Sequence, residues 1–216
     1  MIKLHHLEQS RSLRILWLLE ELGLDYSVET YSRDPQTLRA PAQMGQTLPM
    51  AKSPIIEDDG QCIVESGAII EYLTQIKAGG RLAHGPDSPH FAEYQQWMHF
   101  VEGSMMPPLV YDLISAATGT DNEGLTGFIQ GEADTAFAHA EQRLARHDYL
   151  VADAFSAADV NISFALEFGE ARGRLGGYPA LQAYLARLQD RPAYKAARAK
   201  GGNYDLSIFG AGVADR

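Results

Sequence analysis

The feature that most constrains the fold is an apolar segment near the start of the chain, SLRILWLLEELG. Residues 12–22 carry apolar side chains around most of a helical circumference, and Gly23 supplies a signal for the helix to end. Such a helix is buried on more than one side, so we expect it between a sheet and a second layer. Residues 2–6 and 26–31 flank it and have strand character. A strand–helix–strand order this compact predicts a right-handed βαβ unit.

A second group of elements follows a polar stretch. Residues 33–49 are polar and contain prolines, which predicts a loop with room for one helical turn. The segment PIIEDDGQCIV, residues 54–64, predicts a β-hairpin that turns at Asp58-Asp59-Gly60. Residues 68–76 then show helical spacing. The predicted order is therefore βαβ followed by ββα.

The remainder of the chain has only helical patterns. We expect helices over 90–118 (broken or kinked near Pro107-Pro108), 123–147, 156–172, 179–189 and 192–200. A stretch rich in Gly and Pro precedes them and is typical of a linker. We therefore predict an α/β domain over residues 1–77, a linker over 78–89 and an all-helical domain over 90–216.

Charge and cysteine content limit the partners. The 216 residues carry a net charge of −10, which disfavours nucleic acid because phosphate contacts need clustered Lys and Arg. The single cysteine, Cys62, excludes an internal disulfide and is expected to be buried in a strand. His5-His6 has no further His or Cys at metal-ligand spacing, so no metal is expected. No signal peptide and no apolar run near ~20 residues is present, which favours a cytoplasmic protein without a membrane partner.

Four motifs, taken in order, resemble those of the glutathione S-transferases. They are SRSLR at the first helix, PMAKSPI before the hairpin, ESGAIIEYL after it, and FSAADV in a later helix. The resemblance spans nearly the whole chain and is closest to bacterial and fungal serine-type members. It implies a thioredoxin-like N-terminal domain, a helical C-terminal domain, a homodimer, and glutathione as co-substrate without a metal.

The resemblance also implies a detoxifying activity, in which the glutathione thiolate is conjugated to hydrophobic electrophiles. Two alternatives stay open. The same site would suit reduction of organic hydroperoxides, and the fold also serves non-catalytic binding or regulatory modules.

The thiolate needs a hydrogen-bond donor, since a thiol is a poor nucleophile. Ser10 precedes Arg14 by four residues, as the serine of serine-type members does, and we favour it. Ser12 lies in the first helical turn and is either a second candidate or only a helix cap. A backbone amide is the third alternative. Arg11 either helps to hold a ligand carboxylate or is a solvated side chain.

The resemblance assigns the rest of the glutathione site. Lys52 would meet the glycine carboxylate, and a cis Pro54 would present the backbone of Ser53 to the cysteine moiety. Glu65 and Ser66 would bind the γ-glutamyl end; otherwise they form an acidic first helical turn with a capping serine. Ala51 departs from the glycine usual in the family.

The electrophile pocket is the least defined part. Met105, Met106 and Tyr111 lie in the helix expected to line it, although core packing or a dimer contact would explain each equally well. Phe209 either covers the pocket or packs at the end of the chain. Ser156 and Asp159 form a capping-box pattern before an apolar run, which predicts a structural role.

Overall fold

The computed structural model describes residues 1–47 and 52–210, without the side chains of residues 46 and 47. The chain divides into two compact units. One comprises Met1–Gly85 and Gln189–Tyr204, and the other comprises Pro86–Leu188 and Asp205–Arg216. The first unit thus includes a C-terminal segment, which the sequence did not predict.

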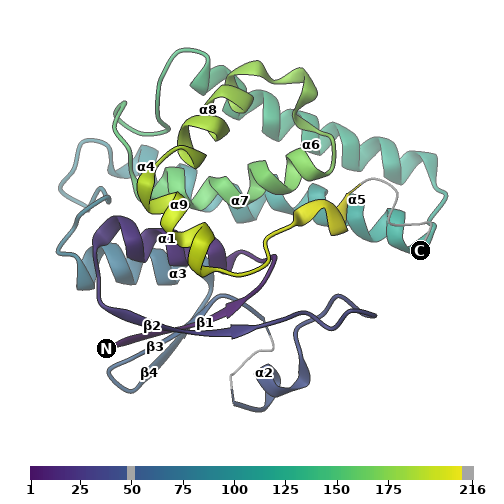
Figure 1. The fold of residues 1–216 in the computed structure, drawn as a ribbon. Coiled ribbons are helices and arrows are strands. Elements are labelled where there is room, and N and C mark those ends of the chain that lie inside the picture. The colour runs from purple at the N-terminus through teal and green to yellow at the C-terminus, as the bar shows by residue number, and fades with distance from the viewer. Residues whose placement is uncertain (48–51, 211–216) are drawn as a thin grey trace. The chain divides into compact units, whose positions relative to one another are not determined.

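A four-stranded mixed sheet forms the base of the first unit (Figure 1). Its strands are β1 (Ile2–Leu7), β2 (Tyr26–Tyr31), β3 (Ile55–Asp58) and β4 (Gln61–Val64), in the order β2-β1-β3-β4. β1 is parallel to β2, with Leu7 opposite Tyr31, whereas β3 is antiparallel to both β1 and β4. This sheet, with the helical unit that follows, confirms the predicted fold class.

The prediction that Cys62 is buried is wrong, because its side chain is exposed. It lies in β4, an edge strand at one end of the order β2-β1-β3-β4. The apolar run beside the turn at Asp58-Asp59-Gly60 identified the strand but did not distinguish an edge strand from a central one.

Helices pack on the sheet. α1 (Ser12–Leu22) and α3 (Ser66–Glu71) lie on one face, and α2 (Ala42–Thr47) lies towards the other (Figure 1). A π-helical segment, η1 (Tyr72–Lys77), continues α3. α1 has the predicted bounds and ends at Gly23, which adopts a left-handed conformation (φ 59°) with its N–H on the Glu20 carbonyl.

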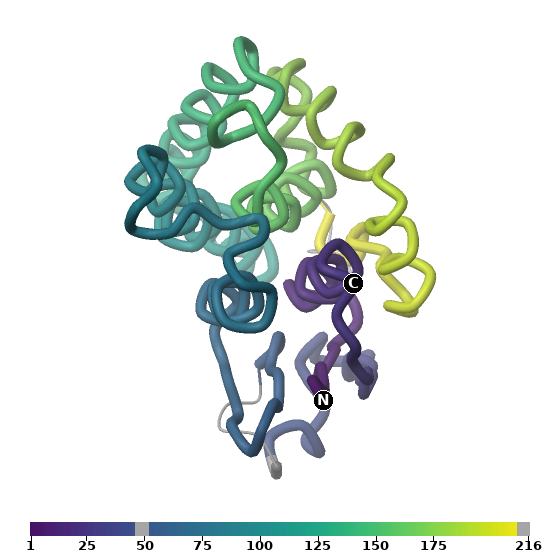
Figure 2. Tube along the Cα trace, turned by 90° about the vertical axis from the view of Figure 1, so that its left-hand side faces the viewer, coloured from purple at the N-terminus to yellow at the C-terminus, as the bar shows by residue number. Residues whose placement is uncertain are grey.

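The second layer over α1 comes from the far end of the sequence. α9 (Pro192–Lys200) lies beside α1 in both views (Figures 1 and 2). The Trp17 and Tyr194 rings meet edge to face with centroids 5.3 Å apart. Arg191 Nε lies 2.6 Å from Glu21 Oε1, and Lys200 Nζ lies 2.5 Å from Glu20 Oε1. Because α1 is covered by the sheet on one side and by α9 on another, apolar residues occupy most of its circumference.

The second unit is helical throughout its regular structure. Its elements are α4 (Phe91–Phe100), η2 (Val101–Met105, a π-helical segment), α5 (Met106–Thr118), α6 (Glu123–Leu144), α7 (Ala157–Ala171), η3 (Leu175–Gly177), α8 (Pro179–Gln189) and η4 (Leu206–Phe209). Pro107 and Pro108 occupy the first turn of α5, where a missing N–H is tolerated. Within the described ranges, no helix is long and apolar enough to cross a membrane.

The predicted capping box at the start of α7 is confirmed. The Ser156 N–H donates to Asp159 Oδ2 at 2.8 Å. The Leu150 N–H and the Tyr184 hydroxyl donate to Asp159 Oδ1 at 3.0 and 2.6 Å. Burial raises the pKa of Asp159, and these donors oppose that rise. The carboxylate therefore ties three separate segments together.

Candidate functional site

The loops that carry the candidate residues meet along the side of the sheet where its strands begin or end. This side is called the sheet edge below, as distinct from the edge strands β2 and β4. β1 and β2 are parallel and end at this edge. β3 is antiparallel to β1 and begins there, and β4 returns to end there. The segments that follow Leu7, Tyr31 and Val64, and the one that precedes Ile55, are therefore neighbours. The edge of a sheet where loops meet helix starts is a common place for ligands in α/β proteins.

Ser10 and Ser12 lie together at the start of α1, with their Oγ atoms 2.8 Å apart. The Ser10 hydroxyl donates to the Leu7 carbonyl at 2.7 Å and accepts the Ser12 N–H at 3.1 Å. Ser10 is 5% exposed and Ser12 is fully buried. Ser10 is therefore slightly more exposed than Ser12.

His6 continues this cluster beneath Ser12. Its Nε2 lies 2.8 Å from the Gly201 carbonyl, and its Nδ1 lies 2.8 Å from Ser12 Oγ. A carbonyl only accepts, so Nε2 carries the proton, and in the neutral ring Nδ1 accepts from Ser12. Burial lowers the pKa of His6, opposed by the Gly201 carbonyl and the Glu8 carboxylate. The sequence alone indicates no such role for His6, whose only candidate function there is metal binding.

The Ser53–Pro54 peptide bond is cis, as the resemblance implied. The Ser53 hydroxyl donates to the His5 carbonyl at 3.1 Å and accepts the Leu7 N–H at 3.2 Å. The side chain of Ser53 is thus held against β1, close to the serine cluster. Lys52 is exposed. Ala51, where the sequence departs from the family pattern, lies outside the described residues.

Ser66 is the first residue of α3 and is buried. Its hydroxyl accepts a hydrogen bond from the buried Arg14 guanidinium of α1. Glu65, which precedes it, is exposed and has a positive φ of 67°. Non-glycine residues rarely adopt this conformation, which often marks functional loops.

Arg33 lies at this site although it was not predicted as a site residue. Its guanidinium donates to the Gln9 carbonyl at 2.8 Å and to the Leu38 carbonyl at 2.6 Å. Burial and the nearby Arg11 charge lower the pKa of Arg33. Two cations therefore lie beside the loop that carries Ser10. A signal was present, since Arg33 follows β2, the parallel neighbour of β1.

The candidates for the electrophile pocket belong to the helical unit. Met105 and Met106 are buried in it, whereas Tyr111 on α5 is 57% exposed. Phe209 packs against Phe168 with ring centroids 5.6 Å apart. The two methionines therefore contribute to the packing of this unit, and Tyr111 offers an accessible side chain.

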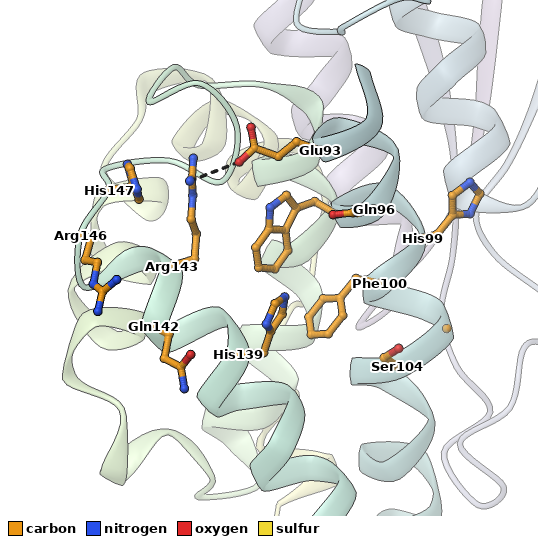
Figure 3. Close-up of a pocket in the computed structure, with 12 residues that line it drawn as sticks. Glu93, Gln96, His99, Phe100, Ser104, His139, Gln142, Arg143, Arg146 and His147 are labelled. Atoms are coloured by element: carbon orange, nitrogen blue, oxygen red, sulfur yellow. Dashed lines mark ion pairs between the residues drawn. The ribbon is translucent and has the colours of Figure 1, made fainter. Parts of the chain in front are cut away.

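The helical unit also contains a pocket of ≈ 790 Å³ between α4, η2 and α6 (Figure 3). Trp97 and His139 stack on its wall with centroids 5.1 Å apart. Arg143 pairs with Glu93 at 3.2 Å. Across residues 1–47 and 52–210, no group of three His, Cys, Asp or Glu side chains suits a metal ion.

Both parts of the chain match families of known proteins. The family model for the glutathione S-transferase N-terminal domain matches residues 1–75, and that for the C-terminal domain matches residues 130–192. Glutathione S-transferase 3 of Schizosaccharomyces pombe is 32% identical, with 97% of this chain and 91% of the relative covered. Glutathione S-transferase 1 of Saccharomyces cerevisiae is 29% identical, with 94% and 98% covered.

A comparison with solved structures gives the same family. A crystal structure of a glutathione S-transferase from Actinobacillus pleuropneumoniae has a TM-score of 0.87 and 29% identity, with 97% of this chain and 100% of that chain covered. The chain therefore belongs to the glutathione S-transferase family, a class of enzymes that use glutathione as co-substrate.

Proposed function

We propose that this protein is a serine-type glutathione transferase in which Ser10 donates a hydrogen bond to the glutathione sulfur. The observation that carries the proposal is the position of the Ser10 hydroxyl. It lies at the start of α1, at the sheet edge that also holds the cis Ser53–Pro54 bond. The thiolate then attacks a hydrophobic electrophile.

The energies required are within reach of this arrangement. An ordinary thiol has a pKa of ~8.5, and lowering it by about two units needs roughly 2.7 kcal/mol in favour of the anion. A hydrogen bond to a charged group contributes roughly 1.5–3 kcal/mol. A partly buried helix N-terminus adds up to ~2 kcal/mol. A hydroxyl at the start of α1 therefore suffices.

The remaining glutathione contacts follow the charges of the tripeptide. Lys52 and Arg11 would pair with carboxylate, and the backbone of Ser53 before Pro54 would hold the cysteine moiety. Ser66 and Glu65 would bind the γ-glutamyl end. The nearness of Arg11 and Arg33 supports an anion at this edge.

The electrophile pocket would include Tyr111, which is accessible, with Met105 and Met106 packed in the same helical unit. Apolar, polarisable side chains suit varied hydrophobic substrates. The proposal also includes a cytoplasmic homodimer with a role in detoxification, which the family resemblance supports. Light scattering on the purified protein measures the oligomeric state.

The test compares Ser10→Ala with Ser27→Ala, a matched control on β2. Turnover of a chlorinated nitroaromatic by Ser10→Ala should fall roughly 10- to 100-fold at neutral pH, because the thiol pKa would no longer be lowered by about two pH units. Raising the pH should partly restore it, since free thiolate then becomes abundant. Ser27→Ala should behave as wild type.

An unchanged pH–rate profile for Ser10→Ala would transfer the role to Ser12 or to a backbone amide. Wild-type protein that neither binds immobilised glutathione nor turns over substrate would favour a non-catalytic module. Parallel assays with an organic hydroperoxide measure the share of peroxidase activity.

A further inference from the structure

We propose that Ser10, Ser12 and His6 form a proton relay that carries the glutathione thiol proton to Nδ1 of His6. The relay rests on the proposed contact between Ser10 and the sulfur. Ser12 and His6 act through Ser10, so both are positioning residues that also pass on a proton.

The three side chains form an unbroken chain of hydrogen bonds. Ser10 Oγ lies 2.8 Å from Ser12 Oγ, which lies 2.8 Å from His6 Nδ1. His6 Nε2 lies 2.8 Å from the Gly201 carbonyl. Ser12 and His6 are fully buried, so bulk water does not compete with these bonds. Each link is short enough for a proton to pass along it.

The Gly201 carbonyl sets the direction of the chain. Because it holds the proton of His6 on Nε2, Nδ1 is an acceptor, and the Ser12 hydroxyl donates to it. Ser12 Oγ is then an acceptor for the Ser10 hydroxyl and for the Leu7 N–H at 3.2 Å. The Leu7 carbonyl also accepts from the Ser10 hydroxyl at 2.7 Å and lies 3.1 Å from Ser12 Oγ. The relay therefore requires both hydroxyl protons to turn from this carbonyl towards the next side chain, which leaves Ser10 Oγ ready to receive one.

The proton transfer balances. The S–H bond of glutathione breaks, its electron pair stays on sulfur, and its proton moves to Ser10 Oγ. The original Ser10 proton moves to Ser12 Oγ, and the Ser12 proton moves to His6 Nδ1. Both hydroxyls end neutral, and one imidazolium and one thiolate are formed. All the hydrogen bonds now point towards sulfur, so the chain that removed the proton stabilises the anion. After conjugation consumes the thiolate, the imidazolium returns its proton to solvent.

The surroundings of His6 suit a base that is unprotonated before glutathione binds. Burial keeps the ring neutral in the free protein by lowering its pKa. Within the described part of the chain, the charge that acts on the ring is the Glu8 carboxylate, which accepts the Asn203 N–H at 2.8 Å. This negative charge and the Gly201 carbonyl partly offset the effect of burial, and the thiolate formed at the other end of the relay adds a second negative charge that favours the imidazolium.

The test counts protons during binding. Glutathione is added to weakly buffered protein just above neutral pH, and a pH indicator reports proton release. Ultraviolet absorbance reports the thiolate formed, and S-methylglutathione, which has no thiol, supplies the background. Wild type should release almost no protons per thiolate, because the protein keeps the proton. His6→Asn should release about one proton per thiolate.

Two further variants complete the design. Ser12→Ala breaks the relay in the middle while the Leu7 N–H keeps its contact with Ser53 Oγ, and it should also release about one proton per thiolate. His99→Asn, on the exposed surface of α4, should match wild type. If His6→Asn does not fold, Ser12→Ala decides the question.

The outcomes separate the two proposals. Ser10→Ala protein that ionises the bound thiol as well as wild type overturns the role of Ser10, and the relay with it. Wild type that releases about one proton per thiolate, like the two relay variants, overturns the relay and leaves Ser10 as a simple donor. Carbon-13 spectra of labelled histidine should show an imidazolium on addition of glutathione and none with S-methylglutathione.

Discussion

The guanidinium of Arg14 in α1 donates a hydrogen bond to the hydroxyl of Ser66, the first residue of α3. Both side chains are buried. In the proposed tripeptide site, Ser10 and Ser66 would contact different parts of glutathione, so this contact holds together the two helix starts that would receive the sulfur and the γ-glutamyl group.

Removing the Ser66 hydroxyl should lower both stability and affinity. In Ser66→Ala, the buried Arg14 cation loses an acceptor, at a cost of about 1–3 kcal/mol. Urea denaturation of Ser66→Ala, Arg14→Met and the double variant measures the coupling between the two side chains. We expect a coupling energy above about 0.5 kcal/mol and weaker glutathione binding by Ser66→Ala. Strictly additive effects would contradict the contact.

The stability of the protein should fall in mild acid because of His6. Burial lowers the pKa of His6, so below the ordinary value of about 6.5 the unfolded chain binds more protons than the folded one. The stabilisation is complete above that pH and is lost as the pH falls towards the lower folded pKa. His6→Asn should have a flatter dependence of Tm on pH, and His99→Asn should keep the wild-type slope. Equal slopes for wild type and His6→Asn would show that His6 does not cause the loss of stability in mild acid.

Asp159 should be among the most sensitive positions of the helical unit. Asp159→Ala leaves the Leu150 N–H, the Ser156 N–H and the Tyr184 hydroxyl without their buried acceptor. We expect a loss of about 3 kcal/mol or more in the free energy of unfolding. The exposed Asp153 pairs with His147, and Asp153→Ala should cost about 1 kcal/mol or less. Urea titrations followed by circular dichroism measure both, and similar losses would refute the distinction.

The contact between α1 and α9 should be visible in fluorescence. Tyr194→Ala removes the ring that meets Trp17, and we expect a loss of about 2–4 kcal/mol together with red-shifted emission from Trp17. Lys195→Ala, on the exposed side of the same helix, should change stability by no more than about 0.5 kcal/mol. An unchanged spectrum in Tyr194→Ala would show that α9 does not cover Trp17.

The sequence predicted correctly those helices whose ends are marked by a glycine or a proline. α1, α8 and α9 have the expected bounds, because Gly23, Pro179 and Pro192 mark an end or a start. The π-helical segment η2 was not foreseen, since apolar spacing does not distinguish hydrogen-bond patterns within a helix. The return of α9 to the first unit was not foreseen either. Few of its residues are buried, and they do not specify which surface they cover.

The candidate site was predictable only in part. The resemblance supplied Ser10, Ser66 and the cis Pro54, whereas His6 and Arg33 were missed. His6 depends on a carbonyl 195 positions away in the sequence. Arg33 depends on strand pairing. The contact of His6 leaves no local pattern, whereas the position of Arg33 shortly after β2 was a signal that could have been used.

The place of Gly201 has a consequence for synthesis in the cell. Residues 189–204 leave the ribosome long after the first residues, yet they complete the unit that the first residues begin. While translation continues, the nascent amino-terminal half has to wait with Trp17 uncovered and His6 without its carbonyl partner. A premature stop codon after position 188 would therefore disable the amino-terminal half as well, and yield no working fragment.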